Sequence, residues 1–225
     1  MAIDLSVDGV ARQEVLGRIR TAIATPAADA GEVDAEWGGI ARGYRRVASL
    51  DREAILELLE DRLRDYDAMV VRARAGGVAA EIACLIAARN VHRIVVPVGL
   101  AEALGEALPA GFEFTADAGF SSAELDGFEG VVTASTIAIA ETGTIVLQNV
   151  PGQGRRAPTL VPDYHLCVVR ADDVVETVPE AMDRLAPTAT LATTFISGPS
   201  ATADIEMTRI KGVHGPRFLD VILVV

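Results

Sequence analysis

AMVVRARAGGVAAEIACLIAARNVHRIVVP, residues 68–97, changes its hydrophobic period twice and thereby indicates the class of fold. Ala68–Ala73 and Arg93–Pro97 are short runs rich in β-branched residues, which favour strands. Between them, Gly76–Asn90 places apolar residues at helical spacing and predicts a helix. A strand, a helix and a second strand in this order form a βαβ unit, which predicts parallel strands with a helix packed on the sheet.

The rest of the chain continues this alternation of strands and helices. Further strands are expected at 112–116, 131–133, 144–148, 164–170, 191–196 and 219–225, and further helices at 100–108 and 179–185. Ala134–Glu141, made of small and β-branched residues, fits either a short helix or extended chain. The pattern predicts one α/β domain whose mostly parallel sheet is covered on both faces.

The N-terminal quarter has a helical pattern. A first helix is expected from a cap at Asp8 to the stretch that starts at Pro26, followed by a loop that carries Trp37. A second helix is expected to begin at Asp51 and to run to Tyr66. We therefore divide the chain into a helical N-terminal extension, residues 1–66, and an α/β domain, residues 67–225.

Composition narrows the range of partners. The 225 residues suffice for a core without metal or disulfide support, and half of them are hydrophobic. Twenty basic side chains stand against 32 acidic ones, which gives a formal net charge of −12. A field of this sign repels nucleic acids and anionic membrane surfaces, so neither is expected as a partner.

The cysteines and the N-terminus indicate the compartment. Cys84 and Cys167 are far apart and follow no CxxC or metal-ligand spacing, so free thiols and no metal site are expected. The first residues carry charges where a signal peptide needs apolar side chains, and no run of 18 apolar residues occurs. We expect a soluble cytoplasmic protein that does not insert into membranes.

A motif rich in glycine, proline and hydroxyl groups, FISGPSATADIE at 195–206, is the first candidate site. If 191–196 is a parallel strand, the motif lies at its carboxyl end, where open α/β sheets bind ligands. The candidate ligand-binding residues are Ser197, Gly198, Ser200, Thr202 and Asp204. The alternative is a helix that begins near Ser200 or Thr202 and is capped by their hydroxyl groups, with Asp204 and Glu206 complementing its dipole.

GVHGP, residues 212–216, holds a second candidate, His214, as a base. In a βαβ crossover the loop after the helix lies at the opposite end of the sheet from the loop before it. The two motifs are therefore not expected to share a site, unless the final strand is antiparallel or a second subunit brings them together. The alternative for His214 is a turn residue that makes one backbone hydrogen bond.

Three further residues could carry chemistry. Glu141, in AIAETGTIVL, is either a turn residue beside a positive-φ Gly143 or a nucleophile or base that faces a cleft. Arg155 and Arg156, in a glycine-rich loop, are either surface residues or a clamp for a small carboxylate, which guanidinium groups bind in a bidentate way. The histidines that open two of the strands, His92 and His165, are expected to be structural.

Four segments together resemble the LUD-domain, or LutC/YkgG, lactate utilization proteins. These segments are 138–147, 154–169, 195–206 and 212–216, and the resemblance extends from about Ala68 to Val225. It implies a three-layer α/β/α fold like that of the NagB/RpiA/CoA-transferase group. It also implies a part in the oxidation of L-lactate to pyruvate, beside partner subunits that carry iron–sulfur clusters. This chain has no cofactor of its own under that expectation.

Two functions of different class remain open at this point. The first is an accessory or substrate-binding subunit of a lactate-oxidising complex, in which Ser200, Thr202, His214 and Arg155 shape a carboxylate pocket or an interface. The second is a free-standing acyl- or CoA-transfer enzyme with Glu141 as nucleophile, suggested by analogy of fold alone.

Overall fold

The computed structural model describes residues 5–23, 29–100, 110–203, 209–211 and 215–225. The chain forms two compact units, Met1–Tyr44 and Arg45–Val225. The boundary between them thus lies ahead of the third helix, α3 (Arg52–Asp65), which packs into the core of the second unit. The helix expected at 100–108 falls largely outside the described residues.

The first unit differs from its expected form in two places. Its first helix, α1, spans Leu5–Ile23, so Asp8 lies inside the helix and does not cap it. Trp37, expected in a loop, lies in a second helix, α2 (Ala30–Gly39). The cap of α2 is Asp29, whose side chain accepts a hydrogen bond of 2.7 Å from the Gly31 N–H. An aspartate cap can thus begin a short helix even where two glycines end it.

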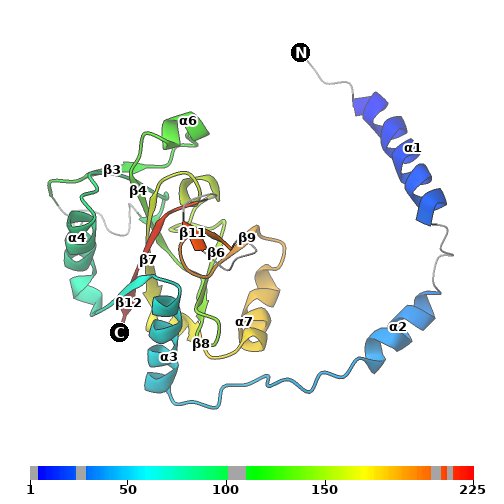
Figure 1. Ribbon diagram of the computed structural model, residues 1–225, viewed down its shortest axis with the longest axis horizontal. Coiled ribbons are helices and arrows are strands. Elements are labelled where there is room, and N and C mark those ends of the chain that lie inside the picture. The colour runs from blue at the N-terminus through cyan, green and yellow to red at the C-terminus, as the bar shows by residue number, and fades with distance from the viewer. Residues whose placement is uncertain (1–4, 24–28, 101–109, 204–208, 212–214) are drawn as a thin grey trace. The chain divides into compact units, whose positions relative to one another are not determined.

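A six-stranded parallel sheet forms the centre of the second unit, which confirms the predicted α/β class (Figure 1). In spatial order its strands are β1 (Met69–Ala73), β12 (Phe218–Val224), β7 (Tyr164–Arg170), β4 (Gly130–Ala134), β2 (Arg93–Val96) and β3 (Glu113–Ala116). All neighbouring pairs are parallel. The helix α4 (Val78–Ala88) joins β1 to β2, as the sequence predicted, but three strands lie between them.

Both faces of this sheet are buried. On one face, Ile82 and Ile86 of α4 pack against Leu166 of β7 and Ile222 of β12. On the other face, α3 and a second sheet share a core with the alternate residues of β7 and β12, among them Cys167. Because successive side chains of a strand point to opposite faces, His165 lies on the same face as Cys167.

A second, four-stranded sheet covers that face, and the sequence did not predict it. Its order is β8 (Val174–Val175), β5 (Ile137–Ile139), β6 (Thr144–Gln148) and β9 (Thr193–Ile196). The segment with two possible conformations, 134–141, is therefore mainly extended. A helix, α7 (Val178–Leu185), packs on the outer side of this sheet, on the side of the molecule away from α4 (Figure 1).

The prediction for the segment after β9 was wrong. β9 pairs antiparallel with β6 and does not belong to the parallel sheet, so the rule that placed a ligand at its carboxyl end does not apply. Ala201–Ala203 is a strand, β10, paired antiparallel with β11 (Arg209–Lys211), so no helix begins at Ser200 or Thr202. Among the described residues, no helix is long and apolar enough to cross a membrane.

Candidate functional site

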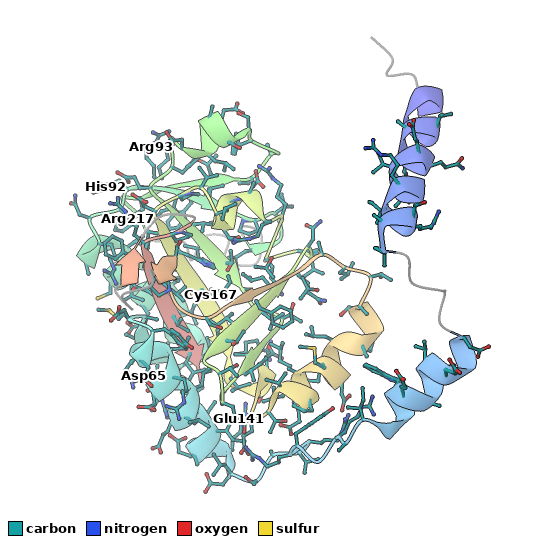
Figure 2. The ribbon with its side chains drawn as sticks, turned by 45° about the vertical axis from the view of Figure 1, so that its right-hand side comes forward. Asp65, His92, Arg93, Glu141, Cys167 and Arg217 are labelled. Carbon is teal, nitrogen blue, oxygen red and sulfur yellow. The ribbon has the colours of Figure 1, made fainter. Side chains whose placement is uncertain are left out.

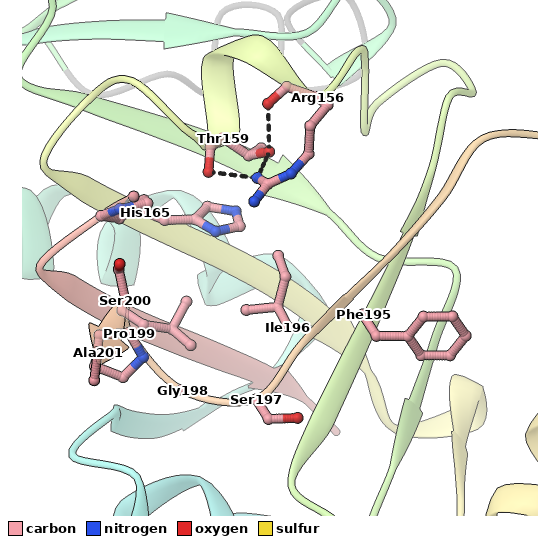
Figure 3. Close-up of a pocket in the computed structure, with 13 residues that line it drawn as sticks. Arg156, Thr159, His165, Phe195, Ile196, Ser197, Gly198, Pro199, Ser200 and Ala201 are labelled. Carbon is pink, nitrogen blue, oxygen red and sulfur yellow. Dashed lines mark hydrogen bonds between the residues drawn. The ribbon is translucent and has the colours of Figure 1, made fainter. Parts of the chain in front are cut away.

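A cavity of about 300 Å³ opens where the second sheet meets the amino ends of β7 and β12 (Figure 3). Clefts of about 390 and 460 Å³ lie elsewhere on the protein, but only the first is lined by both glycine-proline motifs, and it is therefore called the main cavity. Its volume is at the lower end of the usual range for small-molecule sites, about 300–1,000 Å³. Its walls come from four parts of the chain: the turn after β9, a short 3-10 helix at Ala157–Thr159, the start of β7, and the residues before β12. They include Arg156, Thr159, His165, Phe195, the turn Ser197–Ala201, Gly215, Pro216 and Leu219.

The turn after β9 depends on a glycine. Gly198 has a φ of +81°, a conformation that other residues adopt only with strain. A Cβ atom at this position would lie 2.5 Å from the Cβ of Tyr66. Both the conformation and the close approach therefore require glycine, and they fix Ser197 and Ser200 at the cavity wall.

The two glycine-proline motifs meet at this turn, against expectation. The Ser200 N–H donates a hydrogen bond of 2.8 Å to the Pro216 carbonyl, and Gly215 and Pro216 line the same cavity. The crossover argument failed because a β-hairpin, not a helix, follows the turn. The motifs meet within a single chain, although β12 is parallel to both its neighbours.

Three of the sequence candidates in these motifs are not among the described residues that line the cavity. Thr202 lies in β10 opposite Ile210. His214 and Asp204, like Glu206, lie outside the described residues.

Ser197 is held by other hydroxyl groups. Its Oγ lies 2.8 Å from Oγ1 of Thr144 on β6, which in turn lies 2.7 Å from Oγ1 of Thr142. The turn is thereby tied to the second sheet by side chains as well as by backbone.

The two neighbouring arginines have different surroundings. Arg156 lines the main cavity, and its Nη1 donates hydrogen bonds of 2.8 Å to the carbonyl oxygen and to Oγ1 of Thr159. No carboxylate pairs with Arg156 within the described ranges, and burial lowers its pKa. The guanidinium group is nevertheless charged at neutral pH. It is thus a cation in the cavity wall with donor capacity to spare.

Arg155 already has a carboxylate partner. Its Nε and Nη2 donate to the two oxygens of Asp117 at 2.7 and 2.8 Å, and this pairing lowers the pKa of Asp117. Arg155 lines a smaller adjacent cavity of about 80 Å³, not the main one. Of the two arginines of the expected clamp, only Arg156 lines the main cavity.

His165, which sequence reasoning assigned a structural role, is part of the cavity wall. Its side chain comes from the second position of β7 and is only 2% exposed, and Nε2 lies 2.8 Å from Oγ1 of Thr133. Burial, and then the charge of Arg156, lower the pKa of His165 to about 3, so the ring is neutral at physiological pH. In the described part of the chain, Nδ1 has no hydrogen-bond partner. Every fully enclosed side-chain nitrogen or oxygen atom in that part of the chain does have a partner, so Nδ1 is not fully enclosed. Nδ1 must therefore reach the cavity.

Glu141 lies elsewhere, at the turn between β5 and β6. Gly143 in this turn has a φ of +57°, as predicted, and approaches the backbone of Arg62 too closely for a Cβ atom. The Glu141 carboxylate pairs with Arg45, whose guanidinium also pairs with Glu176. Figure 2 shows Glu141 well separated from Cys167 and from Arg217, which follows the second glycine-proline motif. The structure does not bring Glu141 to the main cavity.

The cysteines have the expected free form. Cys84 is exposed and Cys167 is buried in the core. Burial raises the pKa of the Cys167 thiol to about 12, so it is not a thiolate at neutral pH. Within the described residues, no group of three or more His, Cys, Asp and Glu side chains could hold a metal ion.

Comparison with known proteins gives consistent matches. A family model described as the LUD domain matches residues 113–224. Lactate utilization protein C of Deinococcus radiodurans is 42% identical over 184 residues, which are 80% of this chain and 84% of that protein. The uncharacterized protein YkgG of Escherichia coli (strain K12) is 36% identical over 93 residues, 39% of each chain.

A solved structure is similar to this chain in both fold and sequence. The crystal structure of a DUF162 family protein from Deinococcus radiodurans matches with a TM-score of 0.68 and 38% identity. The match covers 79% of this chain and 100% of that one. The shared region therefore includes most of the second unit.

Proposed function

The chain belongs to the LUD-domain family, with the lactate utilization C proteins, and we propose that it is a cytoplasmic subunit of a lactate-oxidising complex that binds a small carboxylate. Its role in lactate utilization follows from that membership. The subunit role and the ligand are the proposal, and the main cavity is where we place the ligand.

The cationic Arg156 in the cavity wall is the observation that carries the proposal. Two donors of its guanidinium, Nε and Nη2, have no partner in the described chain, because only Nη1 is bound to Thr159. A carboxylate is the ligand whose geometry and charge match such a fork. Carboxylates form no part of the described wall, so an anion entering the cavity meets no like charge there.

The chemistry of lactate oxidation supports the proposal that partner subunits accept the electrons. Oxidation of lactate to pyruvate releases two electrons, and no amino-acid side chain takes up a hydride reversibly. The two cysteines of this chain cannot supply the four thiolates of an ordinary iron–sulfur cluster. We therefore propose that subunits with iron–sulfur clusters accept the electrons and that this chain holds or hands over the acid.

Calorimetric titration with L-lactate tests the ligand. Arg156→Gln should weaken binding at least tenfold, about 1.4 kcal/mol, because the charged donors are lost. Arg170→Gln is the matched control, since Arg170 lies at the far end of β7 and is 71% exposed. Equal affinity in the wild type, Arg156→Gln and Arg170→Gln would remove the carboxylate site from the main cavity.

Purification from lactate-grown cells tests the complex. A tagged copy of this chain, introduced into a strain that lacks it, should restore growth on L-lactate and co-purify with proteins that show iron–sulfur absorption. Growth that does not depend on this chain, together with isolation of the chain alone, would contradict the proposed subunit role.

A further inference from the structure

His165 has a side chain that is almost completely buried, and one of its ring nitrogens has no hydrogen-bond partner among the described residues. Nε2 is bound to Thr133, whereas Nδ1 faces the main cavity (Figure 3). Buried polar atoms in folded proteins nearly always have a hydrogen-bond partner, and the exceptions call for a reason. Nδ1 of His165 is not enclosed, so its partner can be water or an atom of a ligand in the cavity.

We propose that His165 recognises the oxygen on carbon 2 of the bound acid, so that the site selects 2-hydroxy and 2-oxo acids over plain carboxylates. The inference rests on the proposed carboxylate site and names its substrate class. Arg156 and His165 line the same cavity, and the charge of Arg156 reaches the imidazole. A carboxylate held by Arg156 therefore places its own neighbouring atoms near the ring.

Selectivity follows from the cost of an unpaired nitrogen. When an acid fills the cavity, Nδ1 loses its hydrogen bond to water. An oxygen on carbon 2 of the acid can form a hydrogen bond with Nδ1 in place of that water. An acid without that oxygen leaves Nδ1 desolvated and unpaired, and sites of this kind reject such analogues strongly. The ring does not compete for the carboxylate as a cation, because it is neutral at physiological pH.

Thr133 allows the same ring to accept both the alcohol and the ketone. Its hydroxyl group lies 2.8 Å from His165 Nε2 and 3.6 Å from the Cys167 sulfur. When Thr133 donates to Cys167, Nε2 carries the ring proton and Nδ1 accepts a hydrogen bond from the hydroxyl group of a 2-hydroxy acid. When Thr133 donates to Nε2, Nδ1 carries the proton and donates to the carbonyl oxygen of a 2-oxo acid. Both states are neutral imidazoles with the same number of protons.

Titrations of the wild type with three acids of equal chain length test the proposal. L-lactate and pyruvate should each bind at least tenfold more tightly than propionate, which lacks only the oxygen on carbon 2. In His165→Leu this preference should fall to about onefold, while propionate keeps its affinity within about threefold.

A matched pair of polar variants separates recognition from packing. His165→Asn keeps a polar atom near the position of Nδ1 and should retain most of the preference. His165→Gln places its polar atoms near the position of Nε2 and should lose it. Circular dichroism identifies any variant that does not fold, and the wild-type ratios test the proposal without any variant.

Each outcome has a defined meaning. If none of the three acids binds the wild type, both the carboxylate site and this inference are wrong. If all three bind equally, the carboxylate site stands and the role of His165 is overturned. A preference for lactate and pyruvate that persists unchanged in His165→Leu and His165→Gln also overturns it.

Discussion

The main cavity differs from a second region, called the Glu176 cluster, in how many of its polar atoms have hydrogen-bond partners. The cluster is formed by Arg45, Ser49, Leu50, Glu141 and Glu176, and both regions contain charged side chains. In the cluster, the Glu176 carboxylate accepts hydrogen bonds from the Ser49 and Leu50 N–H groups at 2.6 and 2.9 Å and pairs with Arg45. In the cavity, Arg156 and His165 keep atoms without a partner in the described chain.

From this difference we infer a structural role for the cluster and propose a functional one for the cavity. The cluster uses its charges to fasten the segment that precedes α3 to the end of β8, and both of its carboxylates pair with Arg45. The cavity holds polar atoms that only a ligand or water can satisfy. Residue type alone does not make this distinction, since each region contains an arginine and a group able to act as a base.

The largest effect on stability is expected in the cluster. Burial alone would raise the pKa of Glu176, but the bonds from Leu50, Arg45 and Ser49 lower it to about 2. Glu176→Gln removes the charge and turns one acceptor into a donor, so the free energy of unfolding should fall by about 2–3 kcal/mol. Urea unfolding measures this change. L-lactate affinity at the main cavity should stay at the wild-type value, and a parallel loss of affinity would contradict the separation of the two regions.

A smaller effect is expected from acidification, through the cavity histidine. The pKa of His165 is about 3 in the folded protein and about 6.5 in an unfolded chain. Below pH 6.5 the unfolded chain therefore binds a proton that the folded protein does not, and the free energy of unfolding falls as the pH decreases towards 3. Between pH 8 and pH 5 the loss should be about 2 kcal/mol.

Urea unfolding at a series of pH values measures this loss. The range above pH 5 avoids the titration of the carboxylates, including Glu176. His165→Leu should remove most of the dependence, whereas His92→Gln, which alters an exposed histidine, should keep it. The same slope in His165→Leu as in the wild type would show that the ring is not buried in its neutral form.

The two strands and the α-helix of 68–97 were predictable because the spacing of apolar residues changes clearly from one element to the next. The pairing of β9 was not, because Thr193–Ile196 followed by a Gly-Pro turn has the same local pattern whether the strand is parallel or antiparallel. β10 was missed for a related reason: Ala201–Ala203 has no strong strand propensity and is held by its partner β11. Tertiary pairing, which the local sequence does not encode, settles both cases.

The candidate site was predictable only in part. Ser197, Gly198, Ser200 and Arg156 were identified because turns and arginines have recognisable chemistry. His165 was not, since it alternates with the apolar residues of β7 and looks like a core residue. The sequence shows which face of the strand His165 shares with Cys167, but the hollow above it forms only when Arg156 and the turn after β9 close around it.

The smallest effect is expected at Glu141, whose carboxylate is 36% exposed and pairs with the exposed Arg45. Exposed pairs contribute little to stability, so the melting temperature of Glu141→Gln should stay within about 2 °C of the wild type. Because Glu141 lies outside the main cavity, L-lactate affinity and growth on L-lactate should also be unchanged. An acyl-transfer enzyme with Glu141 as nucleophile would behave differently: incubation with an acyl-CoA and hydroxylamine would label this side chain, and Glu141→Gln would abolish the labelling and the function. Labelling of Glu141 by this treatment would therefore favour the transferase alternative, and it would move the proposed functional site from the main cavity to the Glu176 cluster.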